Sequence, residues 1–299
     1  MPSYKRELAI AIAAAQRAGP AIMGMFGTAL VTTKPDGSLV TEADLASDRI
    51  IRDIIGTAFP TDALLTEEVI DDQRRLESSR CWIVDPIDGT NAFVRQADDF
   101  DVYIALVVDA RPVVAASLQP TTGLMLTATA GGGSQIWRPG RTAEPLCFRS
   151  PGDSPRLGSR GWLGAPANLP LLERVAKAIG PQATAVCPNA GLGSRSFIPP
   201  DNQVDAMVGV AVDRDKLDAW EWDLAAVDLI VREAGGCSSD LAGSPLRFNQ
   251  PDPRLKELML STDSATHKRI LDALSSTTQG RQRDGKATSV GAQPPAPTV

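Results

Sequence analysis

The sequence has little histidine and no closely spaced cysteine pair. A single histidine, His267, stands among 299 residues, and the four cysteines are widely separated, with no CxxC motif. These shortages exclude metal sites that need several imidazoles and argue against a cysteine-rich zinc site. A Ser-His-Asp or Cys-His triad would have to use His267, which we expect on a solvated terminal helix. The cysteine pattern predicts reduced thiols in a cytoplasmic protein.

Basic runs and long apolar runs are also missing. No run of Lys and Arg exceeds two residues and the net charge is −6, so we do not expect a nucleic-acid polymer as a partner. No apolar stretch approaches the ~20 residues that a membrane-spanning helix needs, so we expect no membrane partner. The apolar residues 8–15, which follow Lys5 and Arg6, are interpreted as part of a first helix rather than as a secretory signal.

Carboxylates, by contrast, are plentiful, with 36 Asp and Glu residues in the chain. Apolar residues make up 43% and charged residues 22%, which is ordinary for a globular protein of one large or two fused domains. If the protein is an enzyme, acids and the hard cations that they bind are therefore its expected agents.

Apolar periodicity predicts mixed helix and strand patterning in two parts. Helices are predicted from Thr41 onward and at 4–26, 170–179, 221–234 and 264–274. Strands are predicted at 63–65, 82–84, 101–109, 112–119, 124–129, 135–137, 183–187, 204–212 and 258–261. A Ser-, Pro-, Gly- and Arg-rich linker at 149–160 divides an N-terminal α+β domain, 1–148, from a C-terminal α/β domain, 149–275. Residues 276–299 lack apolar periodicity and are predicted to form a disordered tail.

The strongest local signal is the segment Asp85-Pro86-Ile87-Asp88-Gly89-Thr90, which follows a hydrophobic strand. The turn places Asp88 three residues after Asp85, so both carboxylates can face one point. Gly89 permits close approach of the backbone to a ligand, and the N–H groups where Thr90 begins a helix can hold a phosphate. Two acids beside a helix N-terminus bring Mg²⁺ and phosphate together, whereas the alternative interpretation is a capped turn with two solvated aspartates.

Three further acidic segments bear on this choice. Glu67 and Glu68 follow another short apolar strand, and Asp223 lies near the N-terminus of a predicted helix. Asp44 lies in the first turn of the helix that Thr41 caps. Taken singly, each is more simply a surface acid or a helix cap. Their order along the chain and their settings together favour a single acidic site.

These segments resemble the motifs of the inositol monophosphatase superfamily of Mg²⁺-dependent, typically lithium-sensitive phosphatases. The matching stretches are LVTEAD at 39–44, TEE at 66–68, WIVDPIDGT at 82–90, WDLAA at 222–226 and EAGG at 233–236. The resemblance extends over residues 5–274. It implies a layered αβαβα sandwich of the inositol monophosphatase and fructose-1,6-bisphosphatase type, with most metal ligands in the N-terminal domain and the site between the two domains.

The resemblance also implies roles for individual residues. The groups that would hold two or three Mg²⁺ ions are Glu67, Asp85, the Ile87 carbonyl, Asp88 and Asp223. One ion would acidify a water that attacks phosphorus, and another would stabilise the leaving group, which makes Glu67 part of the catalytic machinery. Asp44 and Thr90 would orient and deprotonate that water, and the N–H groups of Gly89 and Thr90 would bind the phosphate. Glu68 would act from beside the ligands.

The substrate-binding half departs from the family pattern. Its wall would include Ser194 and Lys216, next to Asp88 and Asp223, but two prolines at 199–200 interrupt the helix that usually follows Ser194. Lys216 stands where inositol phosphatases tend to have an acid that contacts a substrate hydroxyl. A lysine there suits a second phosphate, with two arginines as possible helpers, Arg195 and Arg214. The alternative is that Lys216 is a solvated loop charge.

Residues 243–250 and 220–223 resemble the bisphosphate nucleotidase branch, which removes the 3′-phosphate of adenosine 3′,5′-bisphosphate. Trp162 and Trp220 would stack on its purine, or else simply pack in the fold. The sequence therefore predicts an inositol monophosphatase-like phosphomonoesterase that acts on a small phosphorylated metabolite. The alternatives are a 3′(2′),5′-bisphosphate nucleotidase, a histidinol-phosphatase and a non-catalytic phosphometabolite-binding protein on the same fold. Many relatives are homodimers, so a homodimer is a possible assembly.

Overall fold

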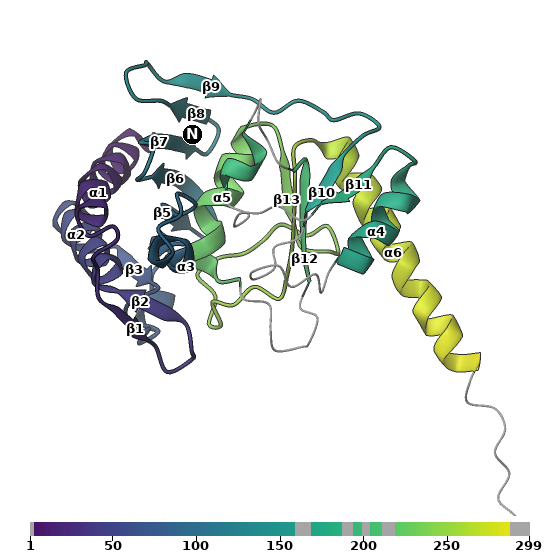
Figure 1. Ribbon diagram of the computed structural model, residues 1–299, viewed down its shortest axis with the longest axis horizontal. Helices are drawn as coiled ribbons and strands as arrows, with labels where there is room; N and C mark the ends of the chain where they lie inside the picture. The colour runs from purple at the N-terminus through teal and green to yellow at the C-terminus, as the bar shows by residue number, and fades with distance from the viewer. Residues whose placement is uncertain (1–2, 159–168, 187–193, 199–203, 211–218, 288–299) are drawn as a thin grey trace, which may run out of the picture.

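The computed structural model describes residues 3–158, 169–186, 194–198, 204–210 and 219–287. Figure 1 shows these residues arranged as alternating layers of helix and sheet. The first layer consists of two N-terminal helices, α1 (Lys5–Gly24) and α2 (Glu42–Ala58). The chain between these helices forms an antiparallel hairpin of two short strands, β1 (Val31–Thr33) and β2 (Leu39–Thr41). Helix α2 begins as predicted, because the Thr41 side chain accepts the N–H groups of its first turn.

The second layer is a seven-stranded sheet in the order β3-β4-β5-β6-β7-β8-β9. Its strands are β3 (Ala63–Thr66), β4 (Arg80–Asp88), β5 (Asp101–Val108), β6 (Arg111–Gln119), β7 (Leu124–Thr129), β8 (Gly133–Trp137) and β9 (Glu144–Leu146). Only the pairing of β3 with β4 is parallel within this sheet. In β5, Ile104 and Leu106 pack toward α1 and α2, while Tyr103 and Ala105 pack toward the other face. This alternation follows from the two-residue period of a strand.

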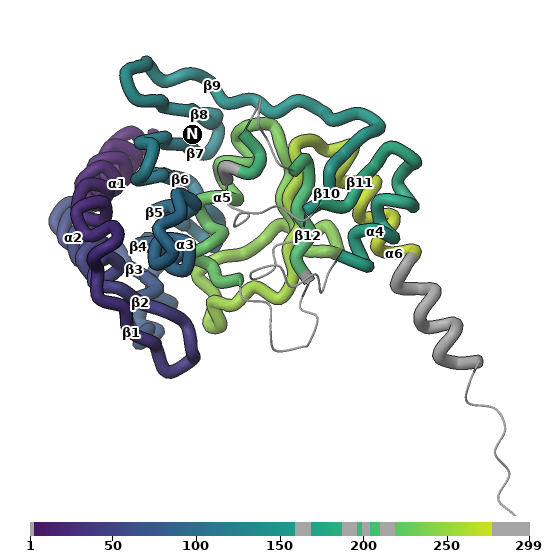
Figure 2. Tube along the Cα trace, in the orientation of Figure 1, coloured from purple at the N-terminus to yellow at the C-terminus, as the bar shows by residue number. Residues whose placement is uncertain are grey.

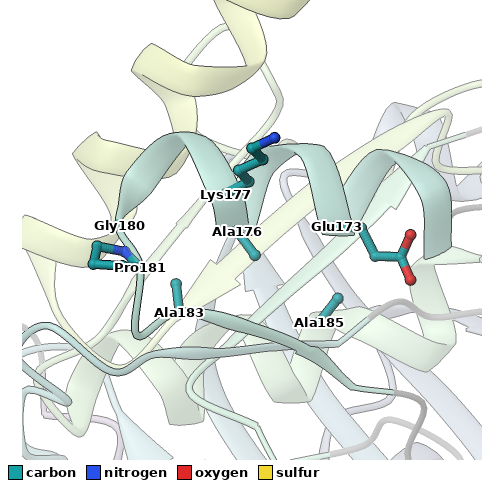
Figure 3. Close-up of a pocket in the computed structure, with 7 residues that line it drawn as sticks. All are labelled: Glu173, Ala176, Lys177, Gly180, Pro181, Ala183 and Ala185. Atoms are coloured by element: carbon teal, nitrogen blue, oxygen red, sulfur yellow. The ribbon is translucent and has the colours of Figure 1, made fainter.

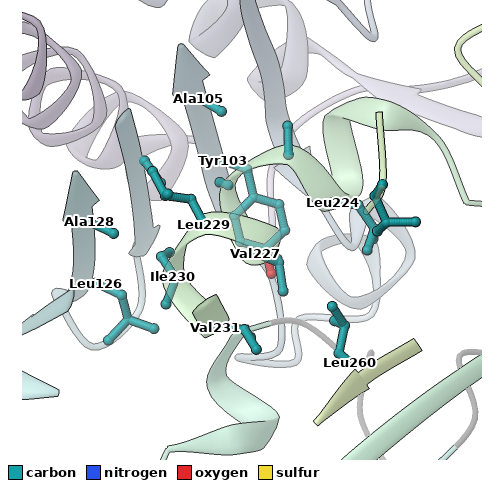
Figure 4. Close-up of a cluster of buried hydrophobic side chains, with 14 of the residues drawn as sticks. Tyr103, Ala105, Leu126, Ala128, Leu224, Val227, Leu229, Ile230, Val231 and Leu260 are labelled. Carbon is teal, nitrogen blue, oxygen red and sulfur yellow. The ribbon is translucent and has the colours of Figure 1, made fainter. Parts of the chain in front are cut away.

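Helix α5 (Glu221–Glu233) forms the third layer and covers that other face. Figure 4 shows its apolar side chains, among them Val227 and Ile230, beside Tyr103, Leu126 and Ala128 of the sheet. Helix α5 belongs to the C-terminal half of the sequence, so the largest buried cluster draws on both halves of the chain.

The fourth layer is a second sheet in the order β11-β10-β12-β14-β13. Its strands are β10 (Arg156–Gly158), β11 (Thr184–Val186), β12 (Ala206–Val210), β13 (Cys237–Ser239) and β14 (Glu257–Ser261). Helices α4 (Leu169–Ile179) and α6 (Ser264–Ala287) pack on its far side around Leu157, Val208 and Met259. The tube in Figure 2 follows the same order of layers. The expected αβαβα sandwich is thereby confirmed.

Several local expectations differ from the structure. The predicted linker at 149–160 contains β10, which pairs with both β11 and β12. The Ser-, Pro- and Gly-rich residues beside this strand gave no indication that it lies inside a sheet. Helix α6 continues to Ala287, so residues 276–287, expected in the tail, are helical. This stretch contains no proline and several Gln, Arg and Lys residues, which are good helix formers. The domain division at residue 148 remains a prediction.

His267 does not lie on a solvated face, contrary to expectation. It is buried against the second sheet, with Nε2 2.9 Å from Ser239 Oγ and Nδ1 2.9 Å from Ser261 Oγ. Burial lowers the pKa of His267 to about 4. Helix α6 packs on β14, and the His267 ring lies between a serine of β13 and a serine of β14, which explains the burial. Among the described residues, no helix is long and apolar enough to cross a membrane.

Candidate active site

Strand β4 extends beyond the predicted 82–84 and carries two acids at its end. Its pairing with β5 shifts register between Asp85 and Asp88, so a bulge interrupts the ladder where these residues lie. A bulge can re-aim side chains that would otherwise alternate between faces. Carboxylate oxygens of Asp85, Asp88 and Asp223 lie within 4.8 Å of one another. The structure thus brings together three of the acids that the sequence singled out.

Asp223 reaches this cluster from the first turn of α5. Its Oδ2 accepts the Trp220 N–H at 2.8 Å, so the carboxylate also caps the helix. The cap interpretation and the site interpretation are therefore compatible. The Trp220 ring stacks on Trp222 at a centroid distance of 4.8 Å, and the Arg254 guanidinium lies 5.9 Å from its centroid. These contacts favour packing over purine stacking for Trp220.

Glu67 and Glu68 follow β3 and lie at the same edge as Asp85, because β3 and β4 run parallel. The Glu67 N–H donates to the Val84 carbonyl at 3.3 Å. Burial raises the pKa of Glu67 to about 8, and the charges of Glu68 and Asp223 add to that rise, while the charge of Lys34 opposes it. Burial also raises the pKa of Glu68.

Lys34 is a member of this site that the sequence did not indicate. It lies in the turn of the β1–β2 hairpin, and its Nζ is 2.9 Å from Glu67 Oε1 and 2.9 Å from Glu68 Oε1. A lysine in a polar turn has no spacing or composition that distinguishes it from a surface charge. Only the fold, which brings the hairpin over the end of β3, could reveal the contact.

Asp44 and Thr90 meet as the resemblance implied. Thr90 Oγ1 donates to Asp44 Oδ1 at 3.0 Å and lies 3.3 Å from the Ile87 carbonyl oxygen. The other oxygen of Asp44 accepts the Thr41 N–H at 2.8 Å and the Thr41 hydroxyl at 2.5 Å. Asp44 is almost completely buried, and this burial raises its pKa. The hydrogen bonds fix the carboxylate with one oxygen turned toward Thr90.

Gly89 connects the acids of β4 to the short helix α3 (Thr90–Val94). Its φ is +98°, a region that L residues with a side chain rarely adopt. A Cβ atom at this position would lie 2.8 Å from the carbonyl oxygen of Asp99. The residue therefore allows both a sharp backbone turn and close packing of two segments beneath the site.

The donor set fits a hard divalent cation. All the ligand atoms are oxygens, the type that Mg²⁺ prefers. Burial raises the pKa of Asp85 well above its ordinary value, and the charges of Glu67 and Asp88 add to this rise. Like charges gathered in a buried place repel one another, and a bound cation would relieve that repulsion. The arrangement can thus hold a cation and present it to an anionic substrate.

Part of the expected substrate wall cannot be placed. Trp162, Arg214, Lys216 and the two prolines at 199–200 lie outside the described residues. Ser194 begins a short 3₁₀ helix, Ser194–Phe197, but its side chain and that of Arg195 are outside the described set. Their assignments to the substrate remain predictions.

Two surface hollows of about 450 Å³ each lie away from the acids. One lies between α4 and β11, where Figure 3 shows Glu173 and Lys177 at its edge above Ala183 and Ala185. The other lies between α1 and the strands β7 and β8, beside Met23. Neither is lined by an acid of the cluster, so the chemistry rather than the volume of a hollow indicates the site.

Comparison with known proteins agrees with the geometry. The family model described as the inositol monophosphatase family matches residues 4–156 and 201–279. The chain belongs to the inositol monophosphatase family. A 3′-phosphoadenosine 5′-phosphate phosphatase of Mycobacterium leprae is 31% identical over 72% of this chain and 76% of its own length. A histidinol-phosphatase of Chlorobaculum parvum is 30% identical over 79% of this chain and 86% of its own length.

Solved structures support the same fold. The inositol monophosphatase of Thermotoga maritima aligns with a TM-score of 0.70 at 21% identity, covering 92% of this chain and 99% of that one. Several relatives of this chain are named as phosphatases, and membership of the family supports a hydrolase that acts on phosphomonoesters. The family assignment leaves the individual roles of the acids and the substrate to be argued.

Proposed function

We propose that this protein is a Mg²⁺-dependent phosphomonoesterase that uses water as its nucleophile. The observation that carries the proposal is the 3.0 Å contact between Thr90 Oγ1 and Asp44 Oδ1, beside the cluster of Asp85, Asp88 and Asp223. The ligands of the cation would be these three aspartates, Glu67 and the Ile87 carbonyl. When bound, Mg²⁺ supplies positive charge to the phosphate oxygens and acidifies water.

Asp44 and Thr90, the catalytic dyad of this proposal, provide a path for the proton of the attacking water. The Thr90 hydroxyl donates its own proton to Asp44, which leaves its oxygen free to accept a proton from water. The Asp44 carboxylate, which two hydrogen bonds from Thr41 hold in place, takes the Thr90 proton and becomes a neutral carboxylic acid, while the water that loses its proton to Thr90 becomes the hydroxide nucleophile. In this scheme the first N–H groups of α3 would bind the phosphate, and Gly89 would allow the backbone to approach it.

The variant Asp44→Asn tests the dyad. One amide oxygen can keep both Thr41 bonds, but the NH₂ group then faces Thr90 and cannot accept its proton. We expect kcat to fall about 10²- to 10⁴-fold, while divalent-cation binding and KM change little. A control on the same helix is Asp53→Asn, which changes an exposed aspartate and should leave kcat unchanged. A loss of cation binding in Asp44→Asn, with kcat preserved at saturating Mg²⁺, would make Asp44 a ligand and the assignment wrong.

Metal dependence is tested by chelation. Activity should disappear in excess EDTA and return with Mg²⁺, because the cation carries the charge that the phosphate requires. The chelated protein should also unfold at lower temperature than the Mg²⁺-loaded protein, since a ligand of the native state stabilises it. Full turnover in excess chelator would refute the proposal.

For the substrate, we propose the 3′-phosphate of adenosine 3′,5′-bisphosphate. Support comes from the relative in Mycobacterium leprae named for that activity. The Chlorobaculum parvum relative makes histidinol phosphate the second candidate. Phosphate release should be compared among these two substrates and an inositol monophosphate.

Lys216→Ala should raise KM for the bisphosphate about 10- to 150-fold, and leave KM for a monophosphate nearly unaffected. Equal small effects on both would argue against a second-phosphate contact.

A further inference from the structure

The position of Lys34 gives the acidic site a cation of its own. Lys34 lies at the end of the β1–β2 hairpin, whose turn is closed by bonds between the backbones of Lys34 and Ser38 and of Gly37 and Lys34. All three residues of β1 are exposed, so the hairpin has little buried contact on that strand. The Lys34 side chain nevertheless points inward and is only 18% exposed.

The ammonium group of Lys34 lies against two glutamates of the site. Its Nζ is 2.9 Å from one oxygen of Glu67 and 2.9 Å from one oxygen of Glu68, and the Glu68 side chain is 3% exposed. Among the described residues, no other base forms an ion pair with either glutamate. Glu67 in turn interacts electrostatically with Asp85 and Asp223, so Lys34 offsets part of the charge of the whole cluster.

We infer that the Lys34 ammonium is the built-in counter-cation of the acidic site, which a divalent cation must displace from Glu67 in order to bind. The inference rests on the proposed function, because it takes Glu67 as a metal ligand. The lone pair of Glu67 Oε1 that accepts the ammonium hydrogen bond is not available to a metal ion, and a metal ion bound to Glu67 Oε2 alone would have the Lys34 charge on the same carboxylate. A metal ion bound to Glu67 and the ammonium group of Lys34 would also repel each other, because both are positively charged.

This competition has a consequence that a purely structural lysine would not have. Removal of the Lys34 charge leaves the glutamates unpaired, so the metal-free protein loses stability. The same removal abolishes both the competitor and the repulsion, so the affinity for a divalent cation rises. A lysine that only held the hairpin in shape would lower stability and cation affinity together. The opposite signs therefore identify a counter-cation.

The first experiment measures Mn²⁺ binding to EDTA-stripped, full-length protein by the electron paramagnetic resonance signal of free Mn²⁺. Mn²⁺ accepts the same oxygen ligands as Mg²⁺. Lys34→Met should lower the Kd about tenfold or more, the effect of one charge-assisted hydrogen bond. Its urea midpoint in EDTA should fall below that of the wild type. Lys34→Arg, which retains the cation, should bind Mn²⁺ nearly as the wild type does.

The control is Lys268→Met, which removes the same charge from an exposed pair with Asp272 on α6. It should change neither the Kd nor the urea midpoint appreciably. An unchanged or higher Kd in Lys34→Met would overturn the inference while leaving the proposed function intact. Failure of the wild-type protein to bind any Mn²⁺ would instead overturn the proposed function, and the inference with it.

The second experiment needs no variant and so does not depend on folding of Lys34→Met. Wild-type protein is labelled with N-hydroxysuccinimidyl acetate with and without Mn²⁺, and acetylation is measured for each lysine peptide by mass spectrometry. Displacement from Glu67 should make the Lys34 amine several-fold more reactive in Mn²⁺, whereas Lys268 should react equally in both. Equal labelling of Lys34 in both conditions would refute the displacement.

Discussion

The substitution Gly89→Ala tests whether the backbone beneath the site requires glycine at this position. A residue with a Cβ atom at φ +98° costs about 1–2 kcal/mol in backbone strain. The new methyl group would also lie 2.8 Å from the Asp99 carbonyl oxygen, and backbone must shift to make room for it. Together these effects predict a loss of about 2–4 kcal/mol in the free energy of unfolding, measured by urea denaturation in EDTA.

The shift of the backbone should also lower the catalytic rate. Gly89 lies between Asp88 and Thr90, so a displaced backbone moves Thr90 relative to Asp44. A displacement of about 1 Å in a catalytic group can lower the rate on the order of 10²-fold. We therefore expect kcat of Gly89→Ala to fall at least that far in Mg²⁺, under conditions in which the variant remains folded.

The matched control is Gly56→Ala in α2. Gly56 is exposed inside the helix, and a Cβ atom there would meet nothing within 4 Å. Alanine should stabilise the protein by about 0.5–1 kcal/mol, because it favours the helix more than glycine does. The same chemical change should thus have opposite signs at the two positions. A Gly89→Ala protein as stable as the wild type would refute the strain argument.

Three further predictions concern other parts of the molecule. Arg75→Met should lower the free energy of unfolding by about 3–5 kcal/mol in urea, because the buried guanidinium pairs with Asp71 and with Asn249 and Gln250; a loss below 1 kcal/mol would contradict this. His267 binds its proton with a pKa of about 4 when folded and near 6.5 when unfolded, so the unfolded chain binds more protons between these values. Stability should therefore fall as pH is lowered from 7 to 5, by on the order of 2 kcal/mol more than in His267→Gln, and equal slopes would count against it. Millimolar Li⁺, a small hard cation, should lower the steady-state rate in Mg²⁺; an unaffected rate would argue against the lithium sensitivity that the family resemblance implies.

Local sequence signals predicted those features that short-range physics determines. Thr41 and Asp44 have the spacing of a capping box, and α2 begins there. The alternation at 101–119 gave the hairpin of β5 and β6 nearly residue for residue. The spacing of Asp85 and Asp88 indicated one site, and the family motifs added Asp223, which lies in the same cluster.

The sequence did not predict features that depend on contacts between residues far apart in the chain. Strand β10 has only three residues, and it pairs with β11 on one side and β12 on the other. The Arg156 side chain of this strand forms an ion pair with Asp205 at 2.9 Å. The composition of β10 itself resembles a linker. The burial of His267 depends on two serines from β13 and β14, and the contact of Lys34 with Glu67 spans 33 residues. No local pattern encodes such contacts.

The way α5 is held explains how the site can tolerate so much negative charge. Helix α5 is buried between the two sheets, and Glu221 in its first turn accepts the N–H groups of Asn249 and Gln250 at 2.6 and 2.8 Å. The main core of the protein therefore fixes Asp223 against Asp85, and repulsion between them cannot separate the carboxylates without disrupting that core. Lys34, by contrast, is carried by a two-stranded hairpin with an exposed outer strand. Rigidly held acids and a lightly held cation are what a site needs if it is to exchange an internal charge for a metal ion.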